Sequence, residues 1–256
     1  MKKAILLMLL VPLMALAQSE NEYLIFETAI LTPNPTQIAQ FEKGLAAHNK
    51  KFHGDGPYGA RIYWISSGPN TGSYNWTMGP LPWSALDGRP GEEEGHDADW
   101  NSNVLAYVAP GSGTTGYWKH ETHVSRFSKD FTIKNMLVDY HDITRGKGKE
   151  AMALVEKIGK VYAEKFPDET YGIYTNQLSS TKEGRDLVVI SFFDKSAWMG
   201  EDNEFAAKYD EVHGEGGFEQ FLQDWYAVTE GGESELWLFR PELSGINGKV
   251  DVADRK

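Results

Sequence analysis

The sequence predicts an α+β fold in which one structural unit occurs twice along the chain. Strand-like runs and amphipathic helical runs follow each other in the same order in both halves, and short matching pairs recur at a nearly constant spacing. Ile62-Tyr63 matches Ile173-Tyr174 at an offset of 111 residues, and Ser84-Ala85 matches Ser196-Ala197 at an offset of 112. An internal duplication accounts for both observations.

The first half begins with a run of β-branched and aromatic residues at 23–30, which favours a strand. A helix is expected to start at Pro35-Thr36 and to end at Gly54, because Ile38, Phe41, Leu45 and Phe52 recur at helical spacing between them. The remaining predicted elements are strands at 60–65 and 74–78, a helix containing Trp100, Val104 and Tyr107, and a last strand at 116–119.

The second half repeats this order, beginning with a strand-like run at 131–138. A helix with one apolar face covers residues 151–166, and Pro167 ends it. The remaining predicted elements are strands at 171–175 and 186–193, a helix with Phe205 and Tyr209, and a last strand at 236–239.

Each half therefore has the order β-α-β-β-α-β, the ferredoxin-like unit, which forms a four-stranded sheet with helices on one face. One unit alone would expose the other, apolar face, so two units are expected to bury these faces against each other. The doubled order resembles the dimeric α+β barrel superfamily in single-chain form, over residues 22–121 and 131–242. Members include antibiotic-biosynthesis-type monooxygenases, stress-response dimers and haem-binding enzymes. The resemblance implies a pseudo-dimeric α+β barrel, but it assigns no site residues because no family's catalytic signature is present.

Aromatic and polar residues are densest between residues 68 and 123, where the two halves differ most. The functional interpretation is a small-molecule pocket that combines apolar walls with a few polar groups. The alternative is that these aromatics are ordinary core and that Asp97 or Asp99 caps a helix. The predicted ligand-binding residues are Tyr74, Trp76, Trp83, His96, Asp97 and Trp100.

The candidate catalytic residues are His96, Asp99 and His141, since a histidine beside a pocket can act as a general base or as an axial haem ligand. His213 is a further, weaker candidate. The run His120-Glu121-Thr122-His123 spaces its histidines at i and i+3, whereas the zincin motif needs i and i+4 on a helix. His96, Asp97 and Asp99 could also supply ligands, since imidazole with carboxylate suits zinc, iron or manganese, but no metal site is predicted.

The N-terminus predicts export. Lys2 and Lys3 precede an apolar run that ends in Ala15-Leu16-Ala17, so residues 1–17 fit a signal peptide cleaved after Ala17 into the periplasm or the medium. Removal of this segment changes the net charge from −12 to −14, which disfavours nucleic acid as a partner. The chain has no cysteine, which excludes disulfides, thiolate nucleophiles and a lipoprotein anchor. Residues 243–256 are polar and are expected to form a flexible tail.

The functional prediction is an exported soluble protein, without a membrane span after cleavage, that binds a small ring-shaped or aromatic ligand. One alternative is a cofactor-free or haem-dependent oxygenase-like enzyme, and another is a non-catalytic interaction scaffold. Whether the chain is an enzyme, its cofactor and its oligomeric state remain open from the sequence.

Overall fold

A computed structural model describes residues 22–251 except residues 93, 129 and 180–182. The expected signal peptide, with its cleavage point after Ala17, lies outside the described residues. Among those described, no helix is long and apolar enough to cross a membrane.

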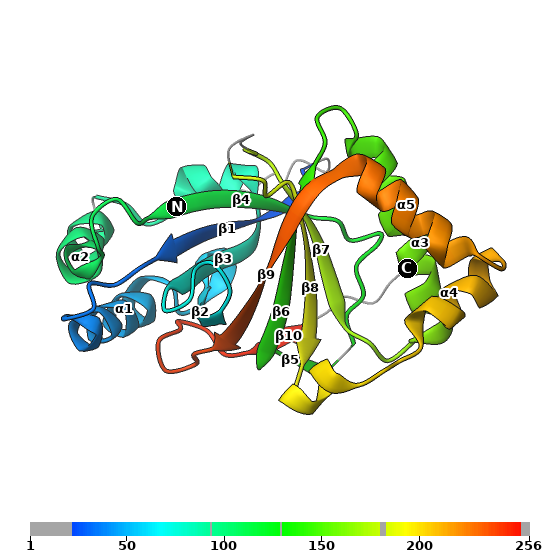
Figure 1. The fold of residues 1–256 in the computed structure, drawn as a ribbon. Helices are drawn as coiled ribbons and strands as arrows, with labels where there is room; N and C mark the ends of the chain where they lie inside the picture. Colours follow the sequence, from blue (N-terminus) through cyan, green and yellow to red (C-terminus); the bar gives the residue numbers. More distant parts are fainter. Residues whose placement is uncertain (1–21, 93, 129, 180–182, 252–256) are drawn as a thin grey trace, which may run out of the picture.

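Eight strands form one closed antiparallel barrel (Figure 1). The barrel order is β1-β3-β2-β9-β6-β8-β7-β4, and β4 returns to β1. The mixed α+β class and the barrel expected from the sequence are therefore confirmed. The strands are β1 (Leu24–Leu31), β2 (Ala60–Ser67), β3 (Tyr74–Pro82), β4 (Thr114–His120), β6 (Asn135–Ile143), β7 (Tyr171–Asn176), β8 (Leu187–Phe193) and β9 (Thr229–Phe239).

The strands of the two halves meet edge to edge. In the first half they lie in the order β4-β1-β3-β2 and in the second in the order β9-β6-β8-β7. Trp64 on β2 pairs with Leu238 on β9, and Trp118 on β4 pairs with Asn176 on β7. The apolar faces are thus buried by closing one barrel, and not by stacking two separate sheets face to face. Closure also removes the free sheet edges that two separate sheets would expose.

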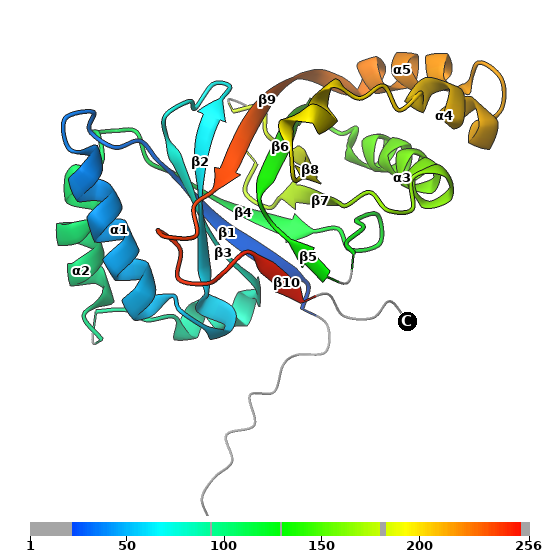
Figure 2. The same ribbon diagram turned by 90° about the horizontal axis from the view of Figure 1, so that it is seen from below.

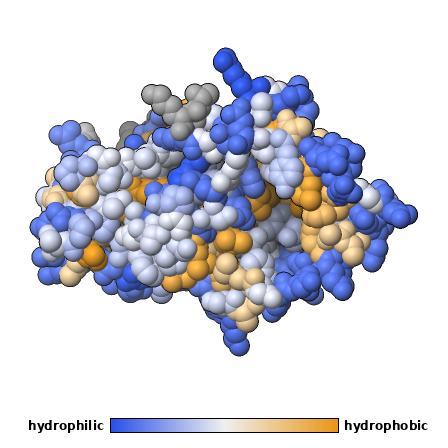
Figure 3. Space-filling view, in the orientation of Figure 1, coloured by the Kyte–Doolittle hydropathy of each residue, from blue (hydrophilic) through white to orange (hydrophobic). Residues whose placement is uncertain are grey.

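The helices cover the outer surface of the barrel in two groups. Helices α1 and α2 lie on one side, and α3, α4 and α5 lie on the other; Figure 2 shows the same separation from below. The face in Figure 3 is mostly hydrophilic toward its two ends, and apolar residues gather near its middle. The helices are α1 (Ile38–Phe52), α2 (His96–Asn103), α3 (Gly148–Lys165), α4 (Phe205–His213) and α5 (Gly217–Val228), with 3₁₀ turns at Gly56–Tyr58, Trp83–Gly88, Leu105–Tyr107 and Ser196–Gly200.

Side chains alternate between the two faces of each strand because successive residues point to opposite sides of a sheet. On β3, Tyr74, Trp76 and Met78 join the core beneath α1, whereas Thr77 faces the barrel interior. On β4, Trp118 and His120 both face the interior. The barrel therefore has two apolar layers, one outside under the helices and one inside.

Four segments differ from expectation. Helix α5 was not predicted, and the helix expected to contain Trp100, Val104 and Tyr107 ends at Asn103 and is followed by a 3₁₀ turn. The run at 131–138 divides into β5 (Asp130–Thr132) and the start of β6, and β5 pairs with β10 (Lys249–Asp251). The expected flexible tail is instead part of the fold as far as Asp251. Leu243 and Ser244 are buried, and Val250 packs against the apolar cluster of the barrel interior. These buried contacts hold the segment against the barrel although most of its residues are polar.

Candidate functional site

The barrel encloses a cavity of about 480 Å³, and all eight of its strands contribute lining residues. The walls are mainly aromatic and aliphatic. Leu24, with 41% of its surface exposed, lies on the rim. The aromatic lining residues are Phe26, Tyr63, Trp118, Phe127, Tyr140, Tyr174, Phe192 and Trp237.

His120 is the one imidazole among the residues that line this cavity. Its ring stacks on Tyr174, with centroids 5.0 Å apart and planes at 23°, and meets Phe127 edge-on at 5.5 Å. Its Nε2 atom is buried and has no hydrogen-bond partner among the described residues. Burial lowers the pKa of His120 to about 4, and this effect outweighs the opposing one of the nearby Glu121 carboxylate. The ring is therefore neutral at pH 7 and has a nitrogen free to bond a ligand.

Other polar groups of the cavity walls are the phenols of Tyr63, Tyr140 and Tyr174, two indoles, and a few hydroxyl and guanidinium side chains. Burial raises the pKa of Tyr63 to about 12, and it also raises the pKa values of Tyr140 and Tyr174. All three phenols therefore stay protonated at pH 7. The Trp118 Nε1–H donates to Thr28 Oγ1 at 3.1 Å, which fixes the indole against the wall.

The lowered pKa of His120 predicts a loss of stability in acid. The unfolded chain, in which the pKa is about 6.5, binds the proton more readily than the folded protein. The free energy of unfolding should thus be intact above about pH 6.5 and should fall as the pH drops toward 4. Between pH 7 and pH 4.5, His120→Phe should lose about 2 kcal/mol less than the wild type in urea unfolding. Equal losses in both proteins would contradict the assignment.

The residues expected to bind a ligand lie outside the barrel cavity. Tyr74, Trp76 and Trp100 belong to the core layer between β3 and helices α1 and α2. The Tyr74 hydroxyl donates to Glu42, and Trp83 packs on Tyr117, so both are separate from the cluster around His96. The residues of the predicted pocket are thus spread over the layer outside the barrel, and none of them lines the barrel interior.

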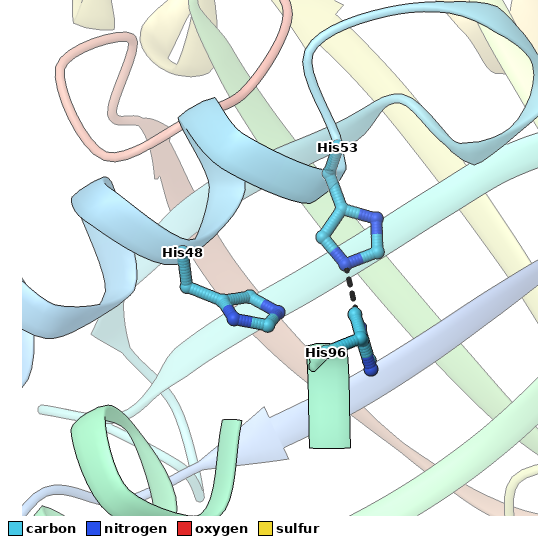
Figure 4. A group of neighbouring side chains, drawn as sticks. All are labelled: His48, His53 and His96. Atoms are coloured by element: carbon cyan, nitrogen blue, oxygen red, sulfur yellow. Dashed lines mark hydrogen bonds between the residues drawn. The ribbon is translucent and has the colours of Figure 1, made fainter. Parts of the chain in front are cut away.

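His96 lies in a group of three histidines at the junction of α1 and α2. Each of His48, His53 and His96 offers one ring nitrogen, and these atoms lie within 4.8 Å of one another. Figure 4 shows the three rings converging, with His48 on α1, His53 just after its end and His96 at the start of α2. Asp97 and Asp99 each bond one of these rings. Among the described residues, this is the group that could hold a metal ion.

Aromatic rings surround the three histidines. Trp76 meets His53 edge-on at 5.1 Å, and Trp100 lies 5.0 Å from His48. Burial lowers the pKa of His53 to about 4 and also lowers the pKa of His48. The expected residues Trp76, His96, Asp97, Asp99 and Trp100 thus do meet, around two histidines that the sequence did not single out.

His141 lies on the opposite side of the barrel, where its ring meets Trp225 of α5 edge-on at 5.0 Å. It lines a cavity of about 200 Å³ beneath α3 and α5. This volume is below the range of about 300–1,000 Å³ that is usual for ligand pockets. The His96 Nε2 atom faces His53 at 3.2 Å. Neither histidine therefore fits the axial-ligand role that the haem-dependent alternative gave it.

Sequence reasoning missed the cavity residues as a site, although most lie in the strands it predicted. One sequence signal could have identified them: residues two positions apart in a strand, such as Trp118 and His120, have their side chains on the same face of the sheet. Sequence reasoning also missed His48 and His53 as site residues, because His96, which lies beside them in the structure, is 43 residues after His53 in the chain.

Comparisons with known proteins find likeness in structure only. No protein-family model and no curated protein sequence matches the chain. A candidate monooxygenase from Lactobacillus acidophilus superposes with a TM-score of 0.55 at 11% identity, covering 91% of this chain and all of that one. A candidate monooxygenase from Fusobacterium nucleatum gives 0.55 at 8% identity, covering 92% and 100%. An anthrone oxidase-like protein gives 0.50 at 10% identity, covering 86% and 92%.

At these identities the likeness extends to the fold and not to the activity. The strand order and the superpositions agree on one architecture. The chain therefore shares with these proteins its overall fold, a closed antiparallel barrel of eight strands with helices on the outside.

Proposed function

We propose that this protein binds a small, ring-shaped and largely apolar ligand inside its β-barrel. The observation that carries the proposal is the cavity of about 480 Å³ with aromatic walls. Its volume lies within the range of about 300–1,000 Å³ that is typical of small-molecule sites. Flat rings suit such walls because offset and edge-to-face aromatic contacts add to the gain from apolar burial.

The polar groups of the cavity narrow the ligand class. The neutral His120 ring offers an unpartnered Nε2 atom, and a few hydroxyl groups, among them the Tyr63, Tyr140 and Tyr174 phenols, stand in otherwise apolar walls. Arg61, which also lines the cavity, donates to the backbone carbonyls of Asn247 and Lys249 at 2.9 and 3.0 Å. Its guanidinium is thus partly committed to the protein. A ring compound with one hydroxyl, carbonyl or ring nitrogen fits this arrangement better than a highly charged metabolite does.

Filling the cavity should abolish binding. Val138 is fully buried and lines the cavity, so Val138→Trp should weaken the binding of the neutral probe N-phenyl-1-naphthylamine at least tenfold. Probe fluorescence, which rises in an apolar environment, measures the affinity. Leu137→Trp is the matched control, because it adds the same side chain to the same strand on the outer face.

The outcome depends on the difference between these two variants. Circular dichroism first establishes that both are folded. Leu137→Trp should bind the probe within about twofold of the wild type. Equal binding by wild type and Val138→Trp would show that the probe sits elsewhere and would overturn the proposal.

An oxygenase-like enzyme is the second candidate, and the unpartnered His120 nitrogen is the observation in its favour. A neutral imidazole beside a bound ring compound could accept a hydrogen bond from a hydroxyl of that compound and so hold the ring in place for attack by oxygen. Two of the similar structures are candidate monooxygenases, but they share only the fold with this chain. Oxygen consumption with a bound hydroxylated ring compound, lost in His120→Phe, would support this candidate.

Export and duplication complete the proposal. The N-terminal Lys2-Lys3, the apolar run and Ala15-Leu16-Ala17 support secretion, and N-terminal sequencing of the mature protein should begin at Gln18. The repeated strand order supports an origin as two tandem ferredoxin-like units.

A further inference from the structure

The hydrogen bonds of the three clustered histidines determine which ring nitrogens carry protons. His48 Nδ1 lies 2.8 Å from Asp99 Oδ1, and His96 Nδ1 lies 2.9 Å from Asp97 Oδ1. His53 Nδ1 lies 2.8 Å from the carbonyl oxygen of Tyr58. Ionised carboxylates and carbonyls only accept, so each Nδ1 must donate its proton. In neutral rings, all three Nε2 atoms then carry lone pairs.

This arrangement matches the way proteins hold metal-binding histidines. A ligating imidazole commonly donates its second ring N–H to a carboxylate or a backbone carbonyl, which fixes the tautomer and the ring orientation. All three rings of the cluster have such a partner on Nδ1. Their Nε2 atoms are left to point toward one another (Figure 4).

The cluster is also poorly satisfied by the protein's own groups. His48 is fully buried, and its Nε2 has no hydrogen-bond partner among the described residues. A buried polar atom without a partner is costly, because it has given up its hydrogen bonds to water and gained none in return. The Nε2 atoms of His53 and His96 are 3.2 Å apart, although their Nδ1 partners make both of them acceptors. A cation between the three rings would satisfy all of these lone pairs.

We propose that His48, His53 and His96 bind one divalent transition-metal ion, with Zn²⁺ as the first choice. Imidazole nitrogens suit Zn²⁺, Cu²⁺, Ni²⁺ and Fe²⁺, whereas Ca²⁺ and Mg²⁺ prefer oxygen ligands. Tetrahedral Zn²⁺ with bonds of about 2.0–2.1 Å holds its nitrogen ligands about 3.3 Å apart. The 3.2 Å separation between His53 and His96 already fits that spacing.

Three protein ligands leave a fourth tetrahedral position for water or a substrate atom. Of the three rings, His96 is the one with appreciable exposure, at 16% of its side chain, whereas His53 is 3% and His48 is 0% exposed. The open position should therefore face the surface beside His96. This site lies on the outer side of the barrel beneath α1 and α2, so it is independent of the proposed ligand cavity.

Metal binding by the purified protein tests this directly. The full mature chain is prepared without an affinity tag and treated with EDTA, and Zn²⁺ is then added in a calorimetric titration. One ion per chain is expected. Co²⁺ in its place should give the visible absorption bands of a tetrahedral site. His96→Ala removes the most exposed ligand and should weaken Zn²⁺ binding at least tenfold.

His123→Ala is the matched control, because His123 is 56% exposed and lies outside the cluster. It should bind Zn²⁺ as the wild type does. Equal weakening in His96→Ala and His123→Ala, or no weakening in either, would place the ion elsewhere and overturn the proposal. So would the absence of binding by wild-type protein that circular dichroism shows to be folded. Probe binding to the barrel cavity should be unchanged in His96→Ala, so the two proposals can fail separately.

Discussion

Replacing Gly44 with alanine should lower the free energy of unfolding by at least about 3 kcal/mol. Gly44 lies in α1 where that helix meets the end of α2, and a Cβ atom there would come within 1.7 Å of the carbonyl oxygen of Asn103. Backbone cannot rotate away as a side chain can, so the two helices would have to separate. In the interior of a helix alanine is otherwise about 1 kcal/mol more stabilising than glycine. A decrease in stability would therefore have to come from the clash with Asn103.

Gly159→Ala is the matched control, since it is also a helical glycine, in α3. A Cβ there would meet the Tyr171 hydroxyl at 3.7 Å, which is ordinary contact. This variant should be neutral or more stable by about 0.4–1 kcal/mol. Thermal melts should place Gly44→Ala about 6–12 °C below the wild type, given about 2–4 °C per kcal/mol for a chain of this size. A melting temperature within about 2 °C of the wild type would refute the close approach of α1 and α2.

Apart from α5, β5 and β10, the order of elements was predictable because it rests on local signals. The period of apolar residues distinguishes helix from strand within a short window, and Pro167 or Gly54 marks where a helix ends. Closure of the barrel rests on the edge pairs β2–β9 and β4–β7, which join residues more than fifty positions apart. Backbone hydrogen bonds make these pairs, so side-chain patterns carry little information about them.

The site was harder to predict because both faces of the strands are apolar. On β3 the aromatic residues Tyr74 and Trp76 point outward under α1, whereas the cavity side of that strand carries Thr77. A search for dense aromatics therefore selects the outer layer. On β4 the reverse holds, and Trp118 with His120 faces inward. Only the register of the closed barrel shows which layer encloses space.

The buried carboxylate of Glu235 on β9 contacts residues from a loop in each half of the chain. Glu235 is 1% exposed, and its carboxylate accepts from Trp237 Nε1 at 2.7 Å and from Asn70 Nδ2 at 2.5 Å. Arg185 lies 3.6 Å away, with its guanidinium 4.5 Å above the ring of Tyr140. Asn70 belongs to the β2–β3 loop and Arg185 to the β7–β8 loop. Trp237 and Tyr140 both line the cavity, and Glu235 lies two residues before Trp237 on the same face of β9, so this carboxylate supports the cavity wall from inside the barrel.

Glu235→Ala should therefore lower the free energy of unfolding by about 3–5 kcal/mol, because it leaves the buried Trp237 N–H, the half-buried Asn70 amide and part of the half-buried Arg185 guanidinium without their acceptor. Glu233→Ala is the control: it removes the same charge two residues away on β9, also beside Arg185, but its side chain is 31% exposed. A partly exposed ion pair of this kind contributes about 1 kcal/mol or less. Urea unfolding of both variants measures the difference. A loss in Glu235→Ala no larger than that in Glu233→Ala would mean that Trp237 and Asn70 find other acceptors, and that the wall of the cavity does not depend on this carboxylate.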